Sequence, residues 1–247
     1  MPDEKGCIPS EPTCYEYLFN ILKSDVMPLV DGISFHPSPE LSPEYGRDNY
    51  YKYYRETIQE IKDVATSHGF KGEYITEGPT FACQARPPQT HYYSDIIAAK
   101  YNSRSIIMHL NENIITILPI QDLHLIPYKV AAIQNLCNIM GGTNPLTIPI
   151  DIQSEAENIR SYSFSLPDGD KLIALWTDGV AVDEDSGVNA DLILPGITAQ
   201  EVIAIDVLNG YQQPITTSKE NGDLVIQNLI VRDYPLILHF TKSSSQN

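Results

Sequence analysis

The hydrophobic pattern of this chain changes once, near Gly142, and that change limits the folds that the chain can adopt. Before Gly142, segments with helical spacing alternate with short apolar runs that are typical of strands. After Gly142, short strand-like runs are separated only by turns. Strands that alternate with helices favour parallel crossovers. We therefore expect an α/β part over residues 1–148, followed by an antiparallel β-sandwich over residues 149–247.

The α/β part has too few strands to form a closed barrel. Helices are expected to begin near Thr13, Asp48, Ser94 and Pro127, with strands over residues 30–36, up to Glu77 and over 114–118. A closed parallel barrel needs eight strands, so the pattern predicts an incomplete TIM-type (β/α) barrel segment. The alternative is an open doubly wound sheet, which usually carries a glycine-rich phosphate loop. The sequence contains neither GxGxxG nor GxxxxGK[ST].

The sandwich is predicted from evenly spaced strands and strong turn signals. The expected strands cover residues 162–166, 171–177, 191–194, 201–206, 223–227 and 236–240. The turns are Pro167–Asp170, Asn209-Gly210 and Asn221-Gly222, which are residue types that favour tight hairpins. Trp176 lies on one of these strands, and we expect it in the core of the sandwich.

The stretch Gly72–Phe81, GEYITEGPTF, places Glu77 at the end of a short strand, immediately before a Gly-Pro turn. Parallel α/β barrels keep their catalytic groups at the carboxyl ends of their strands. Glu77 is therefore the first candidate for a catalytic residue. The alternative is an exposed turn carboxylate with no chemical role.

The charge of the chain limits its partners. Asp and Glu total 32 against 16 Lys and Arg, which gives a formal net charge of -16. Such a surface repels phosphate backbones and anionic lipids, so neither nucleic acid nor a membrane surface is expected as a partner. Neutral sugars remain compatible with this charge.

The motifs GxSxG and HExxH are absent, which argues against a serine hydrolase and against a zincin.

The cysteine pattern predicts no metal site and no cofactor. Cys7, Cys14, Cys83 and Cys137 include no CxxC pair, which argues against a zinc ribbon and a thioredoxin-like site. Free thiols are the expectation, and a Cys7–Cys14 bridge is the alternative.

The first residues lack the basic and apolar regions of a signal peptide, and no run of ~18 apolar residues occurs. If this chain belongs to a longer, secreted protein, the signal peptide of that protein is expected in a part that precedes residue 1.

Several segments together resemble the C-terminal part of a clan-A glycoside hydrolase of the family 39 or family 5 type. The segments in the α/β part are Val30–Pro37, Glu73–Phe81, Ala98–Leu110 and Ile115–Asp122. Those in the sandwich part are Leu172–Gly179, Val202–Gly210 and Asp233–Phe240. The resemblance implies that residues 1–148 correspond to helix 5 through helix 8 of the barrel, and that the sandwich follows it.

The resemblance also implies roles for individual residues. Glu77 matches the nucleophile at the end of the seventh strand, and His36 matches a substrate-contacting histidine on the sixth. No segment matches the acid/base glutamate of the fourth strand. A retaining glycosidase needs both carboxyl groups, so we expect the chain alone to be inactive. Where relatives often place an aromatic residue on the eighth strand, this chain has Leu118-Pro119-Ile120.

Phe81 and Asp122 are further candidates for sugar contacts, together with His36. Each has a simpler alternative. His36 can be satisfied by loop backbone, Asp122 can cap the helix that follows it, and Phe81 can serve in packing.

Two other functions remain open from the sequence. The chain could be a non-catalytic carbohydrate-binding or interaction module, in which the sandwich binds the ligand. It could also be a gene fragment without a function of its own. The open edge of a partial barrel would then promote association with other chains.

Overall fold

The computed structural model describes residues 14–35, 43, 54–77, 81, 93–118 and 126–242. The chain divides into two compact units, and each is described by itself. The first, here the parallel unit, comprises Met1–Thr80 and Ile114–Pro119. The second, here the sandwich unit, comprises Phe81–Asn113 and Ile120–Asn247. None of the helices in the described ranges is long and apolar enough to cross a membrane.

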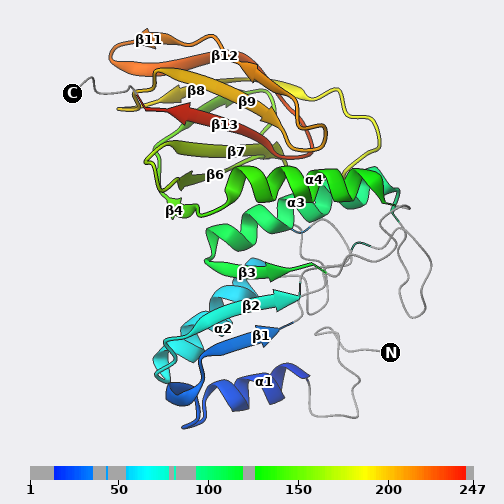
Figure 1. Cartoon of the computed structure of the whole chain (residues 1–247), viewed down its shortest axis with the longest axis vertical. Coiled ribbons are helices and arrows are strands. Elements are labelled where there is room, and N and C mark those ends of the chain that lie inside the picture. Colours follow the sequence, from blue (N-terminus) through cyan, green and yellow to red (C-terminus); the bar gives the residue numbers. More distant parts are fainter. Residues whose placement is uncertain are drawn as a thin grey trace. The chain divides into compact units, whose positions relative to one another are not determined.

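The parallel unit contains a three-stranded sheet in the order β1-β2-β3. Its elements are α1 (Cys14–Leu22), the 3-10 helix η1 (Met27–Leu29), β1 (Gly32–Phe35), α2 (Tyr54–Ser67), β2 (Glu73–Glu77) and β3 (Ile114–Ile117). Both strand pairs are parallel, as Figure 1 shows. Helices that connect parallel strands are the building pattern of α/β folds.

The two faces of this sheet have different surroundings. On one face the hydroxyl of Tyr74 donates to the backbone oxygen of Lys62 in α2 at 3.2 Å, and the neighbouring Thr76 is completely buried. This face therefore packs against α2. On the other face, Ile115 and Ile117 are 46% and 51% exposed. Parallel sheets usually have both faces covered, so the exposure of these two isoleucines is unusual.

The described residues of the sandwich unit form two antiparallel sheets and two helices. The helices are α3 (Asp95–Asn111) and α4 (Pro127–Met140). The strands are β4 (Asn144–Leu146), β5 (Asp151–Ser154), β6 (Ile159–Ser165), β7 (Lys171–Thr177), β8 (Val188–Leu194), β9 (Glu201–Asp206), β10 (Gln212–Pro214), β11 (Ser218–Glu220), β12 (Asp223–Val231) and β13 (Leu236–Thr241). One sheet has the order β10-β9-β13-β7-β6-β4 and the other β11-β12-β8-β5.

The six-stranded sheet is buried on both faces. Ile173 and Leu175 of β7 belong to the core between the two sheets. Trp176 of β7 is also completely buried and stacks on Tyr162 with the ring centroids 5.1 Å apart. The helices α3 and α4 lie beside this sheet (Figure 1), and Asn135 of α4 donates to the backbone oxygen of Val207 at 2.8 Å. This double burial explains the continuous apolar run in β7.

Most of the predicted elements are present. Ser94 caps α3 by accepting from the backbone nitrogen of Ile97 at 3.2 Å, and Pro127 is in the first turn of α4. Asn221-Gly222 joins β11 to β12 with positive φ at both residues. The pattern missed the short strands β4, β5, β10 and β11. The expected helix start at Thr13 lies outside the described residues.

The predicted division at residues 148 and 149 rests on the change of pattern, and it stays a prediction. By packing, α3 and α4 group with the sandwich rather than with the parallel strands. The structure shows parallel strands with connecting helices, followed by an antiparallel sandwich. That the parallel unit is a slice of a barrel is taken up below as a proposal.

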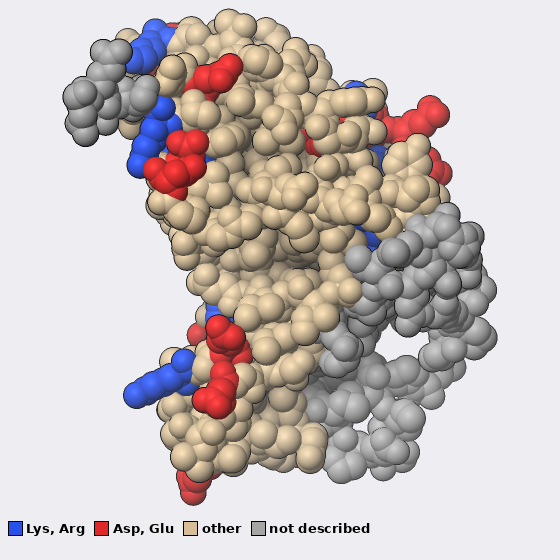
Figure 2. Space-filling view, viewed as in Figure 1, with Lys and Arg blue, Asp and Glu red and all other residues tan. Residues whose placement is uncertain are grey.

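Uncharged side chains make up most of the face shown in Figure 2. Acidic and basic side chains on this face stand in small, separate groups. Among the described residues on this side, charged groups are therefore not gathered into one patch.

Candidate functional site

Glu77 is the last residue of β2, the central strand of the parallel unit. Its backbone lies in register with Ile117 of β3, and the preceding residue, Thr76, is in register with Phe35 at the end of β1. The carboxyl ends of all three strands therefore meet at one edge of the sheet. The sequence placed Glu77 at a strand end, and the backbone confirms that position.

Of the three other predicted sugar contacts, the structure describes only Phe81. His36 and Asp122 lie outside the part of the chain that the structure describes. Phe81 is 1% exposed and packs against Tyr93 and Tyr101, with ring centroids 5.6 and 5.0 Å away. Its ring has the packing role that the sequence left open.

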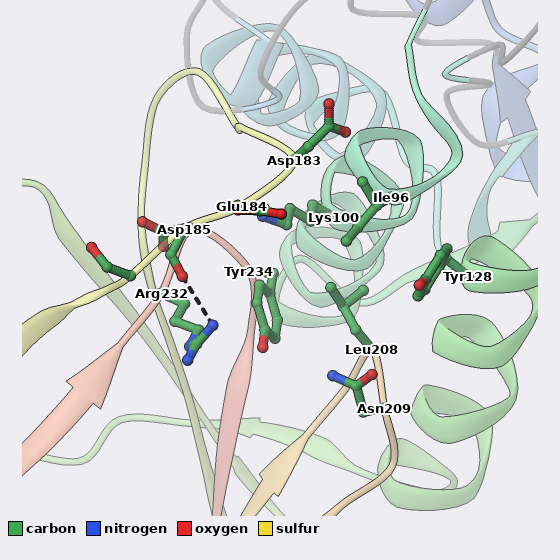
Figure 3. A pocket seen from close by; sticks show the side chains of 11 residues that line it. Ile96, Lys100, Tyr128, Asp183, Glu184, Asp185, Leu208, Asn209, Arg232 and Tyr234 are labelled. Carbon is green, nitrogen blue, oxygen red and sulfur yellow. Dashed lines mark hydrogen bonds between the residues drawn. The ribbon is translucent and has the colours of Figure 1, made fainter.

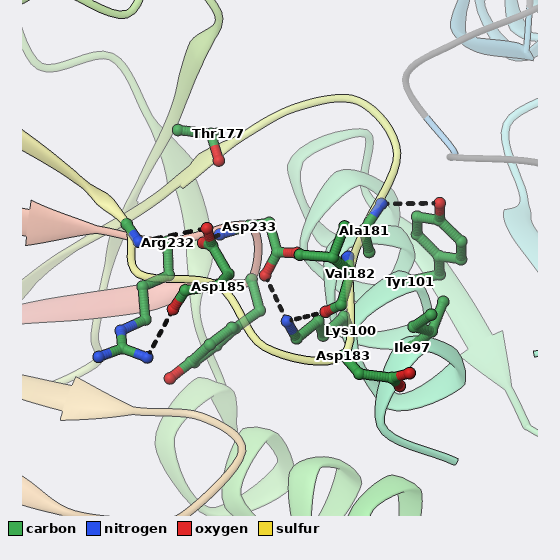
Figure 4. A network of polar contacts seen from close by, with 12 residues as sticks. Ile97, Lys100, Tyr101, Thr177, Ala181, Val182, Asp183, Asp185, Arg232 and Asp233 are labelled. Carbon is green, nitrogen blue, oxygen red and sulfur yellow. Dashed lines mark hydrogen bonds and ion pairs between the residues drawn. The ribbon is translucent and has the colours of Figure 1, made fainter. Parts of the chain in front are cut away.

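The sandwich unit holds a polar network that sequence reasoning missed. It is built on Lys100 and Arg104, one helical turn apart on α3. The Nζ of Lys100 lies 2.6 Å from Oδ1 of Asp233 and donates to the backbone oxygen of Val182, also at 2.6 Å. Figure 4 shows these contacts between α3 and the loop that follows β7.

Arg104 is completely buried, and its guanidinium holds three backbone oxygens. Nη1 donates to Gly179 at 2.7 Å, Nη2 donates to Thr177 at 3.2 Å, and Nε donates to Asp233 at 2.9 Å. A planar group with five N–H donors suits such a set of acceptors. Arg104 therefore fixes α3 to the ends of β7 and β12.

The loop of residues 181–187, here the acidic loop, is held at several points. The backbone nitrogen of Ala181 donates to the hydroxyl of Tyr101 at 2.9 Å, and that of Val182 donates to Oδ2 of Asp233 at 2.8 Å. Further along, Oδ2 of Asp185 accepts from the backbone nitrogen of Asp233 at 2.7 Å. The loop therefore has a defined conformation against α3.

A pocket of about 510 Å³ opens between the acidic loop and the first turns of α3 and α4. Figure 3 shows the side chains around it. The lining residues that matter to its chemistry are Lys100, Tyr128, Glu184, Asn209, Arg232 and Tyr234. They provide two cations, two aromatic rings, a carboxylate and an amide within one cavity.

Two buried groups of the sandwich unit have displaced pKa values. Burial raises the pKa of Tyr234 well above its usual range, and the carboxylate of Asp206, which accepts from its hydroxyl at 3.0 Å, adds to the increase. Burial lowers the pKa of His109 on α3 to about 3. Both groups are therefore neutral at pH 7, and Tyr234 remains a hydrogen-bond donor.

Only one signal for the network was present in the sequence: a lysine and an arginine four residues apart within a helix of small and apolar residues. That spacing places both cations on one face of the helix. Their partner Asp233 is distant in sequence, and no local pattern connects the two. For the described residues, no group of three or more His, Cys, Asp or Glu side chains could hold a metal ion.

Comparisons of sequence find no relatives, since neither a known protein family nor a curated protein matches this chain. Comparisons of structure find proteins with a similar fold. The chain is similar to a GH51 arabinofuranosidase from Xanthomonas axonopodis pv. citri, with a TM-score of 0.55 and 9% identity over 92% of this chain and 56% of that one. It is also similar to a glycoside hydrolase family 44 endoglucanase from Clostridium acetobutylium ATCC 824, with a TM-score of 0.52, 10% identity, and coverage of 94% and 52%.

These likenesses establish the fold and nothing finer. The fold is that of clan-A-like glycoside hydrolases, as the sequence segments suggested, and neither family 39 nor family 5 is favoured in particular. The chain spans about half the length of the two enzymes that it resembles. Because a fold hosts many chemistries, function has to be argued from the site.

Proposed function

We propose that this chain is the C-terminal portion of a retaining O-glycoside hydrolase, with Glu77 as its nucleophile and its acid/base carboxylate on a part that the chain does not contain. The observation that carries the proposal is the position of Glu77 at the carboxyl end of the central parallel strand. In parallel barrels, catalytic groups come from that end of the strands.

The burial pattern of the sheet supports the same proposal. Tyr74 lies on the face that packs against α2, so strand alternation assigns residue 75 to the opposite face. That face also carries the half-exposed Ile115 and Ile117. In a closed barrel the face away from the helices is the filled interior. Further strands, supplied by the rest of the enzyme, would cover these side chains and the two edges of the sheet.

The chemistry divides between two carboxyl groups. The ionised Glu77 attacks the anomeric carbon and forms a glycosyl ester, while a protonated partner gives its proton to the departing oxygen. The partner, now a carboxylate, then takes a proton from water, and the water oxygen displaces Glu77 and releases the sugar. The two groups stand ~5–5.5 Å apart in retaining enzymes. Loss of the general acid removes a factor of ~10²–10⁴.

His36 and Asp122 are proposed to contact sugar hydroxyls at the rim of the same site. His36 directly follows β1 and Asp122 follows β3 in the sequence. The carboxyl ends of β1 and β3 lie at the edge where β2 ends. The substrate of the proposed enzyme is a carbohydrate, and no cofactor enters the reaction.

The experiment compares the chain alone with the chain assembled with the missing barrel portion, which is sought in the reading frame upstream of Met1. Aryl arabinofuranosides, xylosides and glucosides serve as substrates. We expect no useful turnover by the chain alone and clear turnover by the assembled enzyme. Glu77→Gln should abolish that turnover. Turnover by the chain alone that Glu77→Gln removes would contradict the division of the two carboxyl groups.

Glu56→Gln is the matched control, because Glu56 is an exposed glutamate in the first turn of α2. It should leave turnover intact. A 2-deoxy-2-fluoro aryl glycoside, which slows release of the ester, should label the assembled enzyme on the peptide that contains Glu77. Labelling that persists in Glu77→Gln would rule out Glu77 as the nucleophile.

A further inference from the structure

We infer that the pocket between α3, α4 and the acidic loop is a second, non-catalytic binding site for a neutral sugar. All of its lining residues belong to the sandwich unit. The inference goes beyond the proposed function, because it uses neither Glu77 nor any other residue of the parallel unit. Its volume of about 510 Å³ falls within the ~300–1,000 Å³ that is typical of small-molecule sites.

One carboxylate of the acidic loop is available to bind a ligand. Asp183 accepts a hydrogen bond from the hydroxyl of Ser94, and Asp185 accepts from the backbone nitrogens of Asp233 and Gly187. Glu184 stands between these two anchored residues. It is exposed, it lines the pocket, and it has no hydrogen bond or ion pair with another described residue. A carboxylate of this kind is a strong acceptor for sugar hydroxyls.

An exposed aromatic ring stands on another wall of the pocket. Tyr128 is 47% exposed and lies in the first turn of α4. Asp95 fixes this turn, because its carboxylate accepts from the backbone nitrogens of Tyr128 at 2.8 Å and Lys129 at 3.3 Å. An amphipathic ring with a fixed backbone is suited to pack against the apolar C–H face of a sugar.

The charges around the pocket favour a neutral ligand over an ion. Lys100 lines it, but the charge of Lys100 is balanced by Asp233. Arg232 gives one N–H to the backbone oxygen of Asp185 and has further donors in its guanidinium. Asn209 donates to Asp206, which leaves its amide oxygen as an acceptor. A polyhydroxylated, uncharged molecule requires both hydrogen-bond donors and hydrogen-bond acceptors, and this pocket offers both.

Binding is tested on the full chain by calorimetry and ligand-observed NMR, with arabinose, xylose, glucose and cellobiose as probes. We expect saturable binding of at least one of them. Tyr128→Ala should weaken it about tenfold, as expected when an aromatic contact is lost. Glu184→Ala should weaken it by a similar factor through the loss of a charged acceptor. Glu77→Gln should leave it unchanged, whatever the outcome of the glycosidase assays.

Matched controls separate the pocket from the general surface. Tyr211 is 74% exposed and does not line the pocket, so Tyr211→Ala should not alter binding. Glu220→Ala, at an exposed position of β11, is the control for Glu184→Ala. The inference is overturned if no probe binds saturably, or if the control variants weaken binding as much as the pocket variants. It is also overturned if glucosamine binds far more tightly than glucose in a salt-dependent manner, since the ligand would then be a cation.

Discussion

Lys100 of α3 and Asp233, two residues beyond the end of β12, form an ion pair with 2.6 Å between Nζ and Oδ1. The exposed fractions of the two side chains are 1% and 8%. Asp233 also accepts from the backbone nitrogen of Val182, and Lys100 donates to the backbone oxygen of the same residue. The pair therefore joins a helix, a strand end and the acidic loop. Its removal tests whether this junction stabilises the sandwich unit.

Lys100→Met should destabilise the sandwich unit by about 3–5 kcal/mol, because it leaves the carboxylate of Asp233 buried without its cation. Chemical unfolding followed by the fluorescence of Trp176 measures this effect. Trp176 is the only tryptophan of the chain and is completely buried in the sandwich unit.

The double variant Lys100→Met with Asp233→Asn is the matched control. With no uncompensated charge left, its loss of stability should be smaller than the sum of the two single losses by about 0.5–3 kcal/mol. Strict additivity would show that the two residues do not act as a pair.

Arg104→Lys should also destabilise the sandwich unit, although it keeps the charge. A lysine cannot satisfy the backbone oxygens of Thr177, Gly179 and Asp233 together, and each buried acceptor left without a partner costs about 1–3 kcal/mol. The unfolding free energy should fall by about 2 kcal/mol or more. Arg232→Lys is the control, since Arg232 is exposed and donates to one backbone oxygen. A change below about 0.5 kcal/mol is expected there, and equal effects of the two variants would contradict the interpretation.

His109 should make the sandwich unit less stable in acid. Burial holds its pKa at about 3, whereas an unfolded chain has a histidine pKa of about 6.5. Between these values the unfolded state binds a proton that the folded state does not, so stability falls as the pH is lowered from about 6.5. The loss between pH 7 and pH 5 should be about 2 kcal/mol.

His109→Gln removes this titration, so its unfolding free energy should depend less on pH over the same interval. His68→Gln, at an exposed position of the parallel unit, is the control for replacing a histidine. If wild type and His109→Gln lose stability in parallel between pH 7 and pH 5, His109 is not the cause.

Gly72→Ala should destabilise the parallel unit. A Cβ at this position would lie 2.0 Å from the backbone oxygen of Asp31, and overpacking of this kind typically costs about 1–3 kcal/mol. Hydrogen exchange of peptides from β1 and β2 would report faster opening. Gly32→Ala is the matched control, because its Cβ would meet its nearest atoms at 3.6 Å. If both variants exchange like wild type, the close approach at Gly72 is not a constraint.

Local interactions account for the elements that were predicted correctly from the sequence. The side chain of Ser94 accepts a hydrogen bond within its own helix, Pro127 suits a first turn by its fixed φ, and Asn221-Gly222 suits a tight turn. The strand that ends at Glu77 was predicted in the same way. Each of these signals acts over a few residues, so it can be read without knowledge of the fold.

Longer-range effects explain the elements that were missed or misjudged in length. The strands β4, β10 and β11 have only three residues each, too few to show a period. β12 continues to Val231 through an irregularity between Ile226 and Leu229, where the prediction ended at residue 227. There the backbone nitrogen of Asn228 donates to the carboxylate of Asp191 at 2.7 Å, a contact that no local pattern contains.

The sequence by itself determined where most of the described helices and the longer strands lie, that parallel strands precede a sandwich, and that a carboxylate ends the central strand. Tertiary structure alone decided that Lys100 and Arg104 are buried against Asp233, and that Glu184 and Tyr128 line one pocket. The physical reason is the separation along the chain over which each kind of interaction acts. Capping, turn formation and periodicity depend on neighbours in the chain, whereas a buried ion pair or a cavity depends on segments that only folding brings together.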